Sequence, residues 1–143
     1  MTEEIKNYSS EEVEKNAIFP RGPENSAYAQ YFVGNSFLNM LSLKGVVIGN
    51  VTFEPGCRNN WHVHHKGGQI LLVTAGRGYY QEWGKPAQEL HPGDVVNIPA
   101  DTKHWHGAAP TSWFAHIAVE VPAEGSSNEW LEPVNDADYK ILK

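Results

Sequence analysis

The sequence predicts an all-β domain, a barrel or sandwich of short strands, and three observations predict it. Runs of β-branched and aromatic residues recur at intervals of about ten residues after residue 45. Gly and Pro separate these runs, and no helical periodicity of useful length interrupts them. The 143 residues suit one domain. We predict a barrel core over residues 41–122. A helix and an extended arm precede it over residues 1–40, and a tail over residues 123–143 packs on the barrel or on a partner subunit.

The first predicted element is a short helix near the N-terminus. Ser9 and Glu12 have the spacing of a capping box, in which each side chain accepts a hydrogen bond from the other residue's backbone N–H. The helix then runs to about Asn16. Pro20 and Pro23 exclude further helix, so the following segment reads as an extended arm.

The predicted strands share β-branched or aromatic residues and have turn residues at their ends. They are Val46–Phe53, Ile70–Thr74, Gly78–Glu82, Gln88–Leu90, Val95–Ile98 and Trp113–Val121. The stretch after Pro122 has too few apolar residues for a core strand of its own. Trp130, Leu131 and Tyr139 are the residues that can pack this tail on the body or on a second subunit.

Composition narrows the function classes. The formal net charge of −6 argues against a nucleic-acid partner, which is bound mainly by Lys and Arg, and against a basic membrane-surface helix. No apolar run reaches the length of a transmembrane helix. The single cysteine, Cys57, cannot form an intrachain disulfide, and the acidic N-terminal segment does not resemble a secretory signal. We therefore expect a cytoplasmic protein.

Five histidines alternate with other residues on predicted strands. Residues two apart on a strand share a face, so His62 and His64 point the same way, as do His104 and His106. His116 adds an imidazole from the last long strand. These strands line a common cavity if that face is the interior. Core or surface histidines without a metal are the plainer interpretation, which two such patterns in one small domain disfavour.

A divalent transition metal explains the residue types and their spacing. Neutral imidazole is a common ligand of first-row metals, and a pair two residues apart supplies two adjacent coordination positions. Gln69 can reach in from the next strand as an amide-oxygen ligand. The expected ligand set is therefore His62, His64, Gln69 and His104.

Two stretches of the chain resemble the motifs of the cupin family. Residues 56–76 resemble the first motif, G-x5-H-x-H-x4-E-x6-G, with Gln69 in place of the glutamate ligand. Residues 93–108 resemble the looser second motif, with Asp101 where the family has Gly and Ala108 where it has Asn. The resemblance implies a double-stranded β-helix, or jelly roll, that holds a metal. An amide ligand in place of a carboxylate leaves more positive charge on the ion, which makes it a stronger Lewis acid.

A narrower resemblance is to small bacterial cupins with manganese-dependent hydroxynitrile lyase activity. The patterns W-H-x-H, G-Q and K-H-W-H-G of these proteins occur here around His62, Gln69 and His104. The resemblance implies that His106 and His116 are cavity histidines outside the ligand set. It makes manganese the first choice of metal, with iron, nickel or zinc as alternatives.

Three functions are compatible with such a site. The first is a metal-dependent carbon–carbon lyase acting on a small hydroxy or carbonyl compound, in which His106 and His116 carry protons. The second is a three-histidine metal-dependent dioxygenase that activates a chelated enolate toward oxygen. The third is a non-catalytic barrel that binds or senses a small ligand.

Further residues have expected roles around this cavity. Phe53, Phe114 and His65 are the candidate substrate contacts, and the aromatics between Tyr28 and Phe32 can also line an apolar pocket. Trp61 and Trp105 face away from the ligands and are expected in the core. The expected partners are a small-molecule substrate or ligand and, by analogy with the family, a second copy of the chain in a homodimer.

Overall fold

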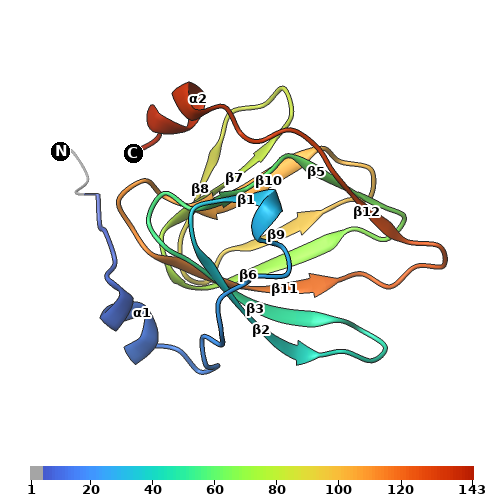
Figure 1. Cartoon of the computed structure of the whole chain (residues 1–143), viewed down its shortest axis with the longest axis horizontal. Coiled ribbons are helices and arrows are strands. Elements are labelled where there is room, and N and C mark those ends of the chain that lie inside the picture. The colour runs from blue at the N-terminus through green and yellow to red at the C-terminus, as the bar shows by residue number, and fades with distance from the viewer. Residues whose placement is uncertain (1–4) are drawn as a thin grey trace.

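The computed structural model describes residues 5–143, and in it two antiparallel β-sheets pack face to face (Figure 1). The strands of the seven-stranded sheet are β1 (Phe32–Val33), β4 (Arg58–Asn59), β5 (His62–His65), β7 (Gly78–Glu82), β8 (Gln88–Leu90), β10 (His104–Ala108) and β12 (Ser127–Trp130). The strands of the five-stranded sheet are β2 (Ser36–Ser42), β3 (Ile48–Phe53), β6 (Gln69–Gly76), β9 (Val95–Ile98) and β11 (Phe114–Glu120). The expectation of an all-β fold is confirmed.

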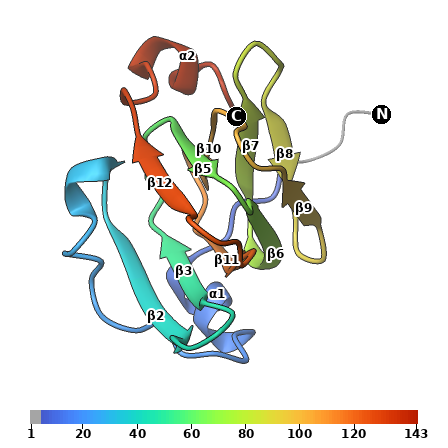
Figure 2. The ribbon, with the colours of Figure 1, turned by 90° about the vertical axis from the view of Figure 1, so that its right-hand side faces the viewer.

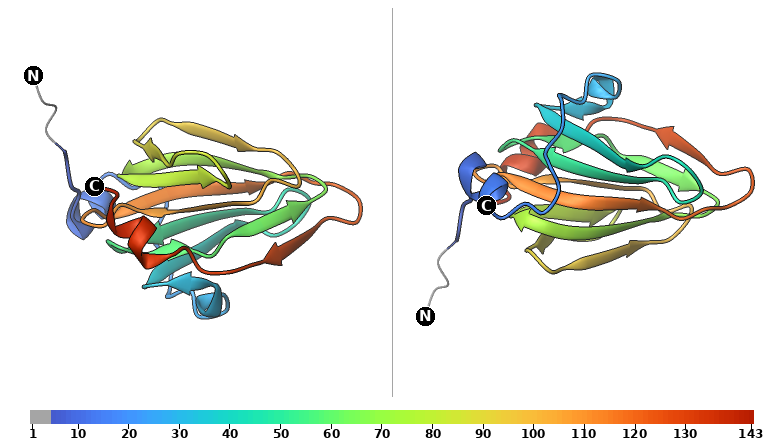
Figure 3. Two further views of the ribbon diagram at one scale, coloured as in Figure 1. Left: turned by 90° about the horizontal axis from the view of Figure 1, so that it is seen from above. Right: turned by 90° about the horizontal axis from the view of Figure 1, so that it is seen from below.

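Two short α-helices and one 3₁₀ turn accompany the sheets. They are α1 (Ser10–Lys15), η1 (Ala29–Tyr31) and α2 (Asp136–Lys140). The predicted capping box is present: the Ser9 hydroxyl accepts from the Glu12 N–H at 3.1 Å, and the Glu12 carboxylate accepts from the Ser9 N–H at 3.3 Å. Figure 3 shows α1 and α2 at the same end of the two sheets.

Alternating burial decides which side chains enter the space between the sheets. In β6, Leu71 and Val73 are buried while Leu72 and Thr74 between and after them are exposed. Leu71 and Val73 join a core that spans both sheets, from Val51 on β3 to Tyr80 on β7. The apolar contacts of this core hold the sheets together, because burial of apolar area is the main favourable term in folding.

The predicted extended arm contains more regular structure than expected. Besides η1 it includes β1 and the beginning of β2, which crosses the predicted boundary at residue 40. β2 pairs with β3 over the register from Ser36–Phe53 to Ser42–Ile48. β2 is a strand because β3, which follows it in the chain, supplies its hydrogen-bond partners. The local sequence of β2 alone does not predict this pairing. The division into arm, barrel core and tail stays a prediction.

The tail also differs from expectation, because it forms an edge strand and a helix. β12 lies beside β5 and pairs antiparallel with it (Figure 2). In this pairing Asn128 lies opposite His64, and Trp130 lies opposite His62. An edge strand needs backbone hydrogen bonds on one side only, so a stretch with few apolar residues can form it. Farther along, Val134 and Tyr139 pack with Trp61 and Trp105, which lie in the core as predicted.

The turn between β5 and β6 requires glycine. Gly67 and Gly68 have φ angles of 112° and 102°. A Cβ atom on Gly68 would lie 2.4 Å from the Ile98 carbonyl oxygen, and one on Gly67 would lie 2.4 Å from that of Val121. The turn therefore lies close against both neighbouring strands, which fixes where β6 and Gln69 begin. Among residues 5–143, no helix has the length and hydropathy that crossing a membrane requires.

Candidate metal centre

Three buried histidines from two neighbouring strands meet in the interior. His62 and His64 point inward from β5, and His104 lies directly opposite His62 on the antiparallel strand β10. Each imidazole offers one nitrogen atom to a group in which all these atoms lie within 4.8 Å of one another. All three side chains are at most 4% exposed. Three buried histidines at this separation could bind one metal ion.

Hydrogen bonds fix the tautomer of all three imidazoles. The Nδ1 atom of His62 lies 2.8 Å from the Asn60 carbonyl oxygen, and that of His104 lies 2.9 Å from the Thr102 carbonyl oxygen. The Nδ1 atom of His64 lies 2.8 Å from Oδ1 of Asn128. These oxygens only accept, so each Nδ1 carries the hydrogen and each Nε2 keeps a free lone pair.

Unpartnered acceptors test whether the site fits a metal. Among the described residues, Nε2 of His64, Nε2 of His104 and Oε1 of Gln69 are buried atoms without a hydrogen-bond partner. Gln69 is on β6 in the other sheet and lines the same cavity as His62 and His64. Buried acceptors without donors are costly unless something else pairs with them. A divalent ion meets that requirement for imidazole nitrogens and an amide oxygen together.

Burial keeps two of the candidate ligands, His62 and His104, neutral. Desolvation, with a smaller effect of the nearby His64, lowers the pKa of His104 to about 4. Desolvation likewise lowers the pKa of His62 well below its ordinary value, with repulsion from His104 as the next cause. Neutral imidazole is the form that binds a metal, so the fold prepares these ligands at neutral pH.

His106 and His116 form a second, coupled pair beside the first group. Nδ1 of His106 lies 3.1 Å from Nε2 of His116, and both side chains are at most 4% exposed. Asn59 accepts from the His106 backbone N–H at 2.9 Å through Oδ1, and its Nδ2 faces the His106 ring, 3.2 Å from Nε2 and 3.4 Å from Nδ1. One hydrogen lies between Nδ1 of His106 and Nε2 of His116, and either nitrogen can be its donor. Desolvation lowers the pKa of both imidazoles, to about 3 for His116.

A cavity of about 240 Å³ borders both groups of histidines, although His104 does not line it, and its walls are mainly apolar. His62, His64, Gln69, His106 and His116 all contribute to its lining. Its aromatic walls are Tyr28, Phe32 and Trp130. Trp130 stacks on Tyr31 with ring centroids 4.6 Å apart and lies 4.6 Å from the His62 ring. The arm and the tail therefore close one side of this cavity.

The predicted substrate contacts lie elsewhere. Phe53 and Phe114 are fully buried behind His116, with ring centroids 5.4 Å and 5.5 Å from it, and neither lines the cavity. They instead fill the core that positions His116, since the inward face of β3 and β11 is packed at this end. His65 points to the opposite face from His64 and pairs with Asp101 at 3.0 Å and Glu129 at 2.7 Å. The role of these three residues as substrate contacts stays a prediction.

Sequence reasoning missed the polar residues that support the histidines. Asn59 on β4 and Asn128 on β12 orient His106 and His64, and Glu120 at the end of β11 contacts Gln69. No periodicity marks an isolated Asn or Glu as a partner of a histidine far away in the chain. The only local signal of such a residue is that its polar side chain points inward from a strand.

Cys57 is fully buried, and desolvation raises the pKa of its thiol to about 12, so it is not an activated nucleophile.

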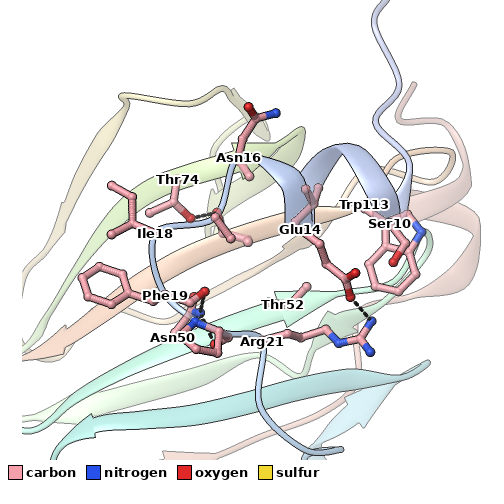
Figure 4. A pocket seen from close by; sticks show the side chains of 15 residues that line it. Ser10, Glu14, Asn16, Ile18, Phe19, Arg21, Asn50, Thr52, Thr74 and Trp113 are labelled. Carbon is pink, nitrogen blue, oxygen red and sulfur yellow. Dashed lines mark hydrogen bonds and ion pairs between the residues drawn. The ribbon is translucent and has the colours of Figure 1, made fainter.

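A larger cavity of about 460 Å³ lies on the outer face of the five-stranded sheet, under α1 (Figure 4). Asn50, Thr52 and Thr74 form its floor, and Trp113 stands at one end. No histidine lines it, and its charged groups, Glu14 and Arg21, pair with each other at 3.0 Å. The histidine cavity is smaller, but it brings together the groups that can do chemistry.

Comparisons with known proteins agree with this architecture. The cupin domain family model matches residues 49–117. The chain is 48% identical over 91 residues to an (R)-mandelonitrile lyase of Granulicella tundricola, and the match covers 64% of this chain and 69% of that protein. A cupin-like protein of Thermotoga maritima superposes with a TM-score of 0.81 at 43% identity, covering 88% of this chain and 96% of that chain.

A more distant solved structure shows the same fold. A DMSP lyase of Ruegeria pomeroyi superposes with a TM-score of 0.58 at 16% identity, covering 78% of this chain and 57% of that one, and this likeness concerns the fold alone. The chain therefore belongs to the cupin family.

Proposed function

We propose that this cupin is a metal-dependent carbon–carbon lyase that cleaves a small hydroxynitrile to a carbonyl compound and hydrogen cyanide. The observation that carries the proposal is the position of the coupled His106–His116 pair beside three preoriented metal ligands. The ring centroids of His62 and His106 are 5.7 Å apart, so proton carriers and ligands border one cavity. A purely structural metal site would have no use for this second pair.

The proposed ligands are His62, His64, Gln69 and His104, and the proposed cofactor is one divalent ion, with manganese as the first choice. When bound, such an ion polarises a substrate oxygen and favours loss of the proton from a hydroxyl group. Three imidazole nitrogens and one amide oxygen suit manganese, iron, nickel or zinc. The manganese assignment comes from the resemblance described above.

The His106–His116 pair is proposed to move protons. The ring nitrogen of His106 that carries no hydrogen accepts the hydroxyl proton of the substrate. The carbon–carbon bond to the nitrile then breaks, and its two electrons leave with the cyanide carbon. The His106–His116 pair then returns one proton to cyanide. Net proton balance on the protein is zero. Burial disfavours a charged pair, so a proton taken up by His106 is readily passed on.

The apolar walls are proposed to hold the substituent of the substrate. Phe32 and Trp130 from β1 and β12 offer aromatic surfaces, and Leu38 on β2 offers an aliphatic one. A cavity of about 240 Å³ suits a small aromatic or aliphatic compound. The likeness to an (R)-mandelonitrile lyase supports an aromatic substituent as the first one to test.

Two measurements test the proposal. Purified protein should contain about one equivalent of metal by plasma mass spectrometry, and the His62→Ala/His64→Ala variant should lose it.

The second measurement is activity: the wild-type protein should release benzaldehyde from (R)-mandelonitrile. His106→Ala should lower this turnover by about 10²–10⁴-fold with metal content unchanged. Equal turnover in His106→Ala would contradict the proton role, and absence of cleavage together with oxygen uptake on a 1,3-diketone would support the dioxygenase instead.

A further inference from the structure

Glu120 stands directly opposite Gln69 in the register of β11 and β6. Directly opposed residues on antiparallel strands share a face, so both side chains project toward the histidine cavity. The Gln69 amide donates from Nε2 to Oε1 of Glu120 at 2.6 Å. The other carboxylate oxygen, Oε2, lies 3.4 Å from Nδ1 of His64. One carboxylate therefore contacts two of the four proposed ligands.

This contact selects the atom that Gln69 presents to the cavity. A carboxamide has an oxygen end and a nitrogen end of similar shape, and only its hydrogen bonds decide which end points where. A carboxylate only accepts, so the NH₂ group of Gln69 must face Glu120. Oε1 of Gln69 then faces away from Glu120, and it is buried without any hydrogen-bond partner. A buried oxygen without a partner is costly, and a bound metal ion would supply the partner.

We propose that Glu120 is the positioning residue that makes Gln69 an oxygen ligand and that returns to the site the carboxylate charge that an amide ligand lacks. The inference rests on the ligand set proposed above. Charge-assisted hydrogen bonds are short and polarising, so the amide oxygen of Gln69 carries more negative charge than a free amide oxygen. The site therefore still contains a carboxylate, which belongs to Glu120, the partner of Gln69, and not to the proposed ligand itself. An ion bound at this site would therefore be a weaker Lewis acid than an amide ligand without the Glu120 contact would make it.

The inference explains why glutamine is suited to this position. A glutamate at position 69 would put two carboxylates within about 3 Å of each other without a hydrogen to share, and like charges at that separation repel strongly. Exchanging the two residues, as in Gln69→Glu/Glu120→Gln, would restore a donor–acceptor pair. The amide at position 120 would then donate to a carboxylate at position 69, and that carboxylate would be the ligand.

The test is metal binding, measured on metal-free protein without any substrate. Co²⁺ is the probe, because its affinity and visible absorption spectrum both report the ligand atoms. Glu120→Gln should bind Co²⁺ about 10–100-fold more weakly and with an altered spectrum. Gln69→Glu/Glu120→Gln should recover most of the affinity lost in Glu120→Gln. Glu120→Asp, which keeps the charge but withdraws it by one methylene, should fall between wild type and Glu120→Gln.

The matched control is Glu54→Gln. Glu54 is also partly exposed and also accepts from a carboxamide, that of Asn35 at 3.3 Å, but it does not line the histidine cavity. Its Co²⁺ affinity should equal that of wild type. Wild-type affinity and spectrum in Glu120→Gln, or a double variant no better than Glu120→Gln, would overturn the inference and leave the proposed function intact. No Co²⁺ or Mn²⁺ uptake by the wild-type protein would overturn both.

Discussion

Burial determines the charge of the two histidines that we assign to proton transfer. His106 and His116 contact each other, and desolvation favours the neutral form of both. For His106, repulsion from His116 adds to this effect. Both residues line the histidine cavity, and their rings are joined by one hydrogen bond. A proton acceptor with a depressed pKa is a weak base in isolation, so the pair depends on a substrate hydroxyl that is already acidified.

The same burial makes the metal-free protein sensitive to acid. The pKa of His116 is about 3 in the folded protein, against an ordinary value of 6.5. Between these two values the unfolded chain binds a proton that the folded chain does not, so the free energy of unfolding falls as the pH drops from 6.5 toward 3. The loss is about 1.4 kcal/mol per pH unit for each such histidine. Urea unfolding at pH 7 and pH 5 measures it.

A glutamine substitution isolates the contribution of His116. His116→Gln removes the titrating group and should reduce the difference in unfolding free energy between pH 7 and pH 5. His91, whose side chain is 54% exposed, serves as the control, and His91→Gln should leave this difference unchanged. An equal pH dependence in wild type and His116→Gln would show that the pKa of the buried imidazole is the same in the folded and the unfolded chain.

At the scale of elements, β12 shows how an edge strand supports a site in the middle of a sheet. Its pairing with β5 puts Asn128 opposite His64 and Trp130 opposite His62. The first residue accepts from Nδ1 of His64, and the second forms a cavity wall. β12 therefore contributes to the metal centre although none of its residues is a proposed ligand.

Loss of the Asn128 side chain tests this role of β12. Asn128→Ala leaves Nδ1 of His64 with Glu120 as its remaining partner, at 3.4 Å, so the imidazole is less firmly oriented. We expect Mn²⁺ binding, measured by titration calorimetry, to weaken about 10-fold or more. Ser127→Ala changes the exposed neighbouring residue and should bind Mn²⁺ as wild type does. Equal affinity in both variants would mean that β12 only covers the cavity.

At the scale of the whole molecule, Arg77 ties both terminal segments to the barrel. It lies in the turn between β6 and β7, and its side chain is 1% exposed. The guanidinium donates to the Lys6 carbonyl at 3.1 Å, to Oδ1 of Asn7 at 2.8 Å and to the Lys143 main-chain oxygen. It also pairs with Glu89 at 3.1 Å. Both ends of the described chain are therefore held at one point, at the end of the barrel that carries the two helices (Figures 1 and 3).

Removal of this arginine should destabilise the fold and loosen both terminal segments. Arg77→Ala removes a buried side chain together with all of these hydrogen bonds and should lower the free energy of unfolding by about 2–4 kcal/mol in urea. Limited proteolysis should then cut near both ends faster than in wild type. Lys85→Ala removes an exposed pair with Glu82 and should change stability by less than about 1 kcal/mol. Proteolysis at one end only would show that Arg77 holds a single segment.

Much of the architecture follows from local pattern. The strands Gly78–Glu82, Gln88–Leu90 and Val95–Ile98 have the predicted bounds, and the capped helix begins where predicted. Alternation at period two also predicts that His62 and His64 share a face, because successive side chains of a strand point to opposite sides. These features depend on neighbouring residues in the chain, so the sequence contains them.

The partners of those histidines depend on contacts between distant segments. Gln69 meets Glu120 because β6 pairs with β11 in one register, and a shift of one residue would turn these side chains to opposite faces. Asn128 meets His64 only because the tail adds a strand beside β5. Register and strand order are set by packing over the whole barrel, which local periodicity does not encode. The sequence therefore determined the candidate ligands, and the tertiary structure alone decided the residues that orient them.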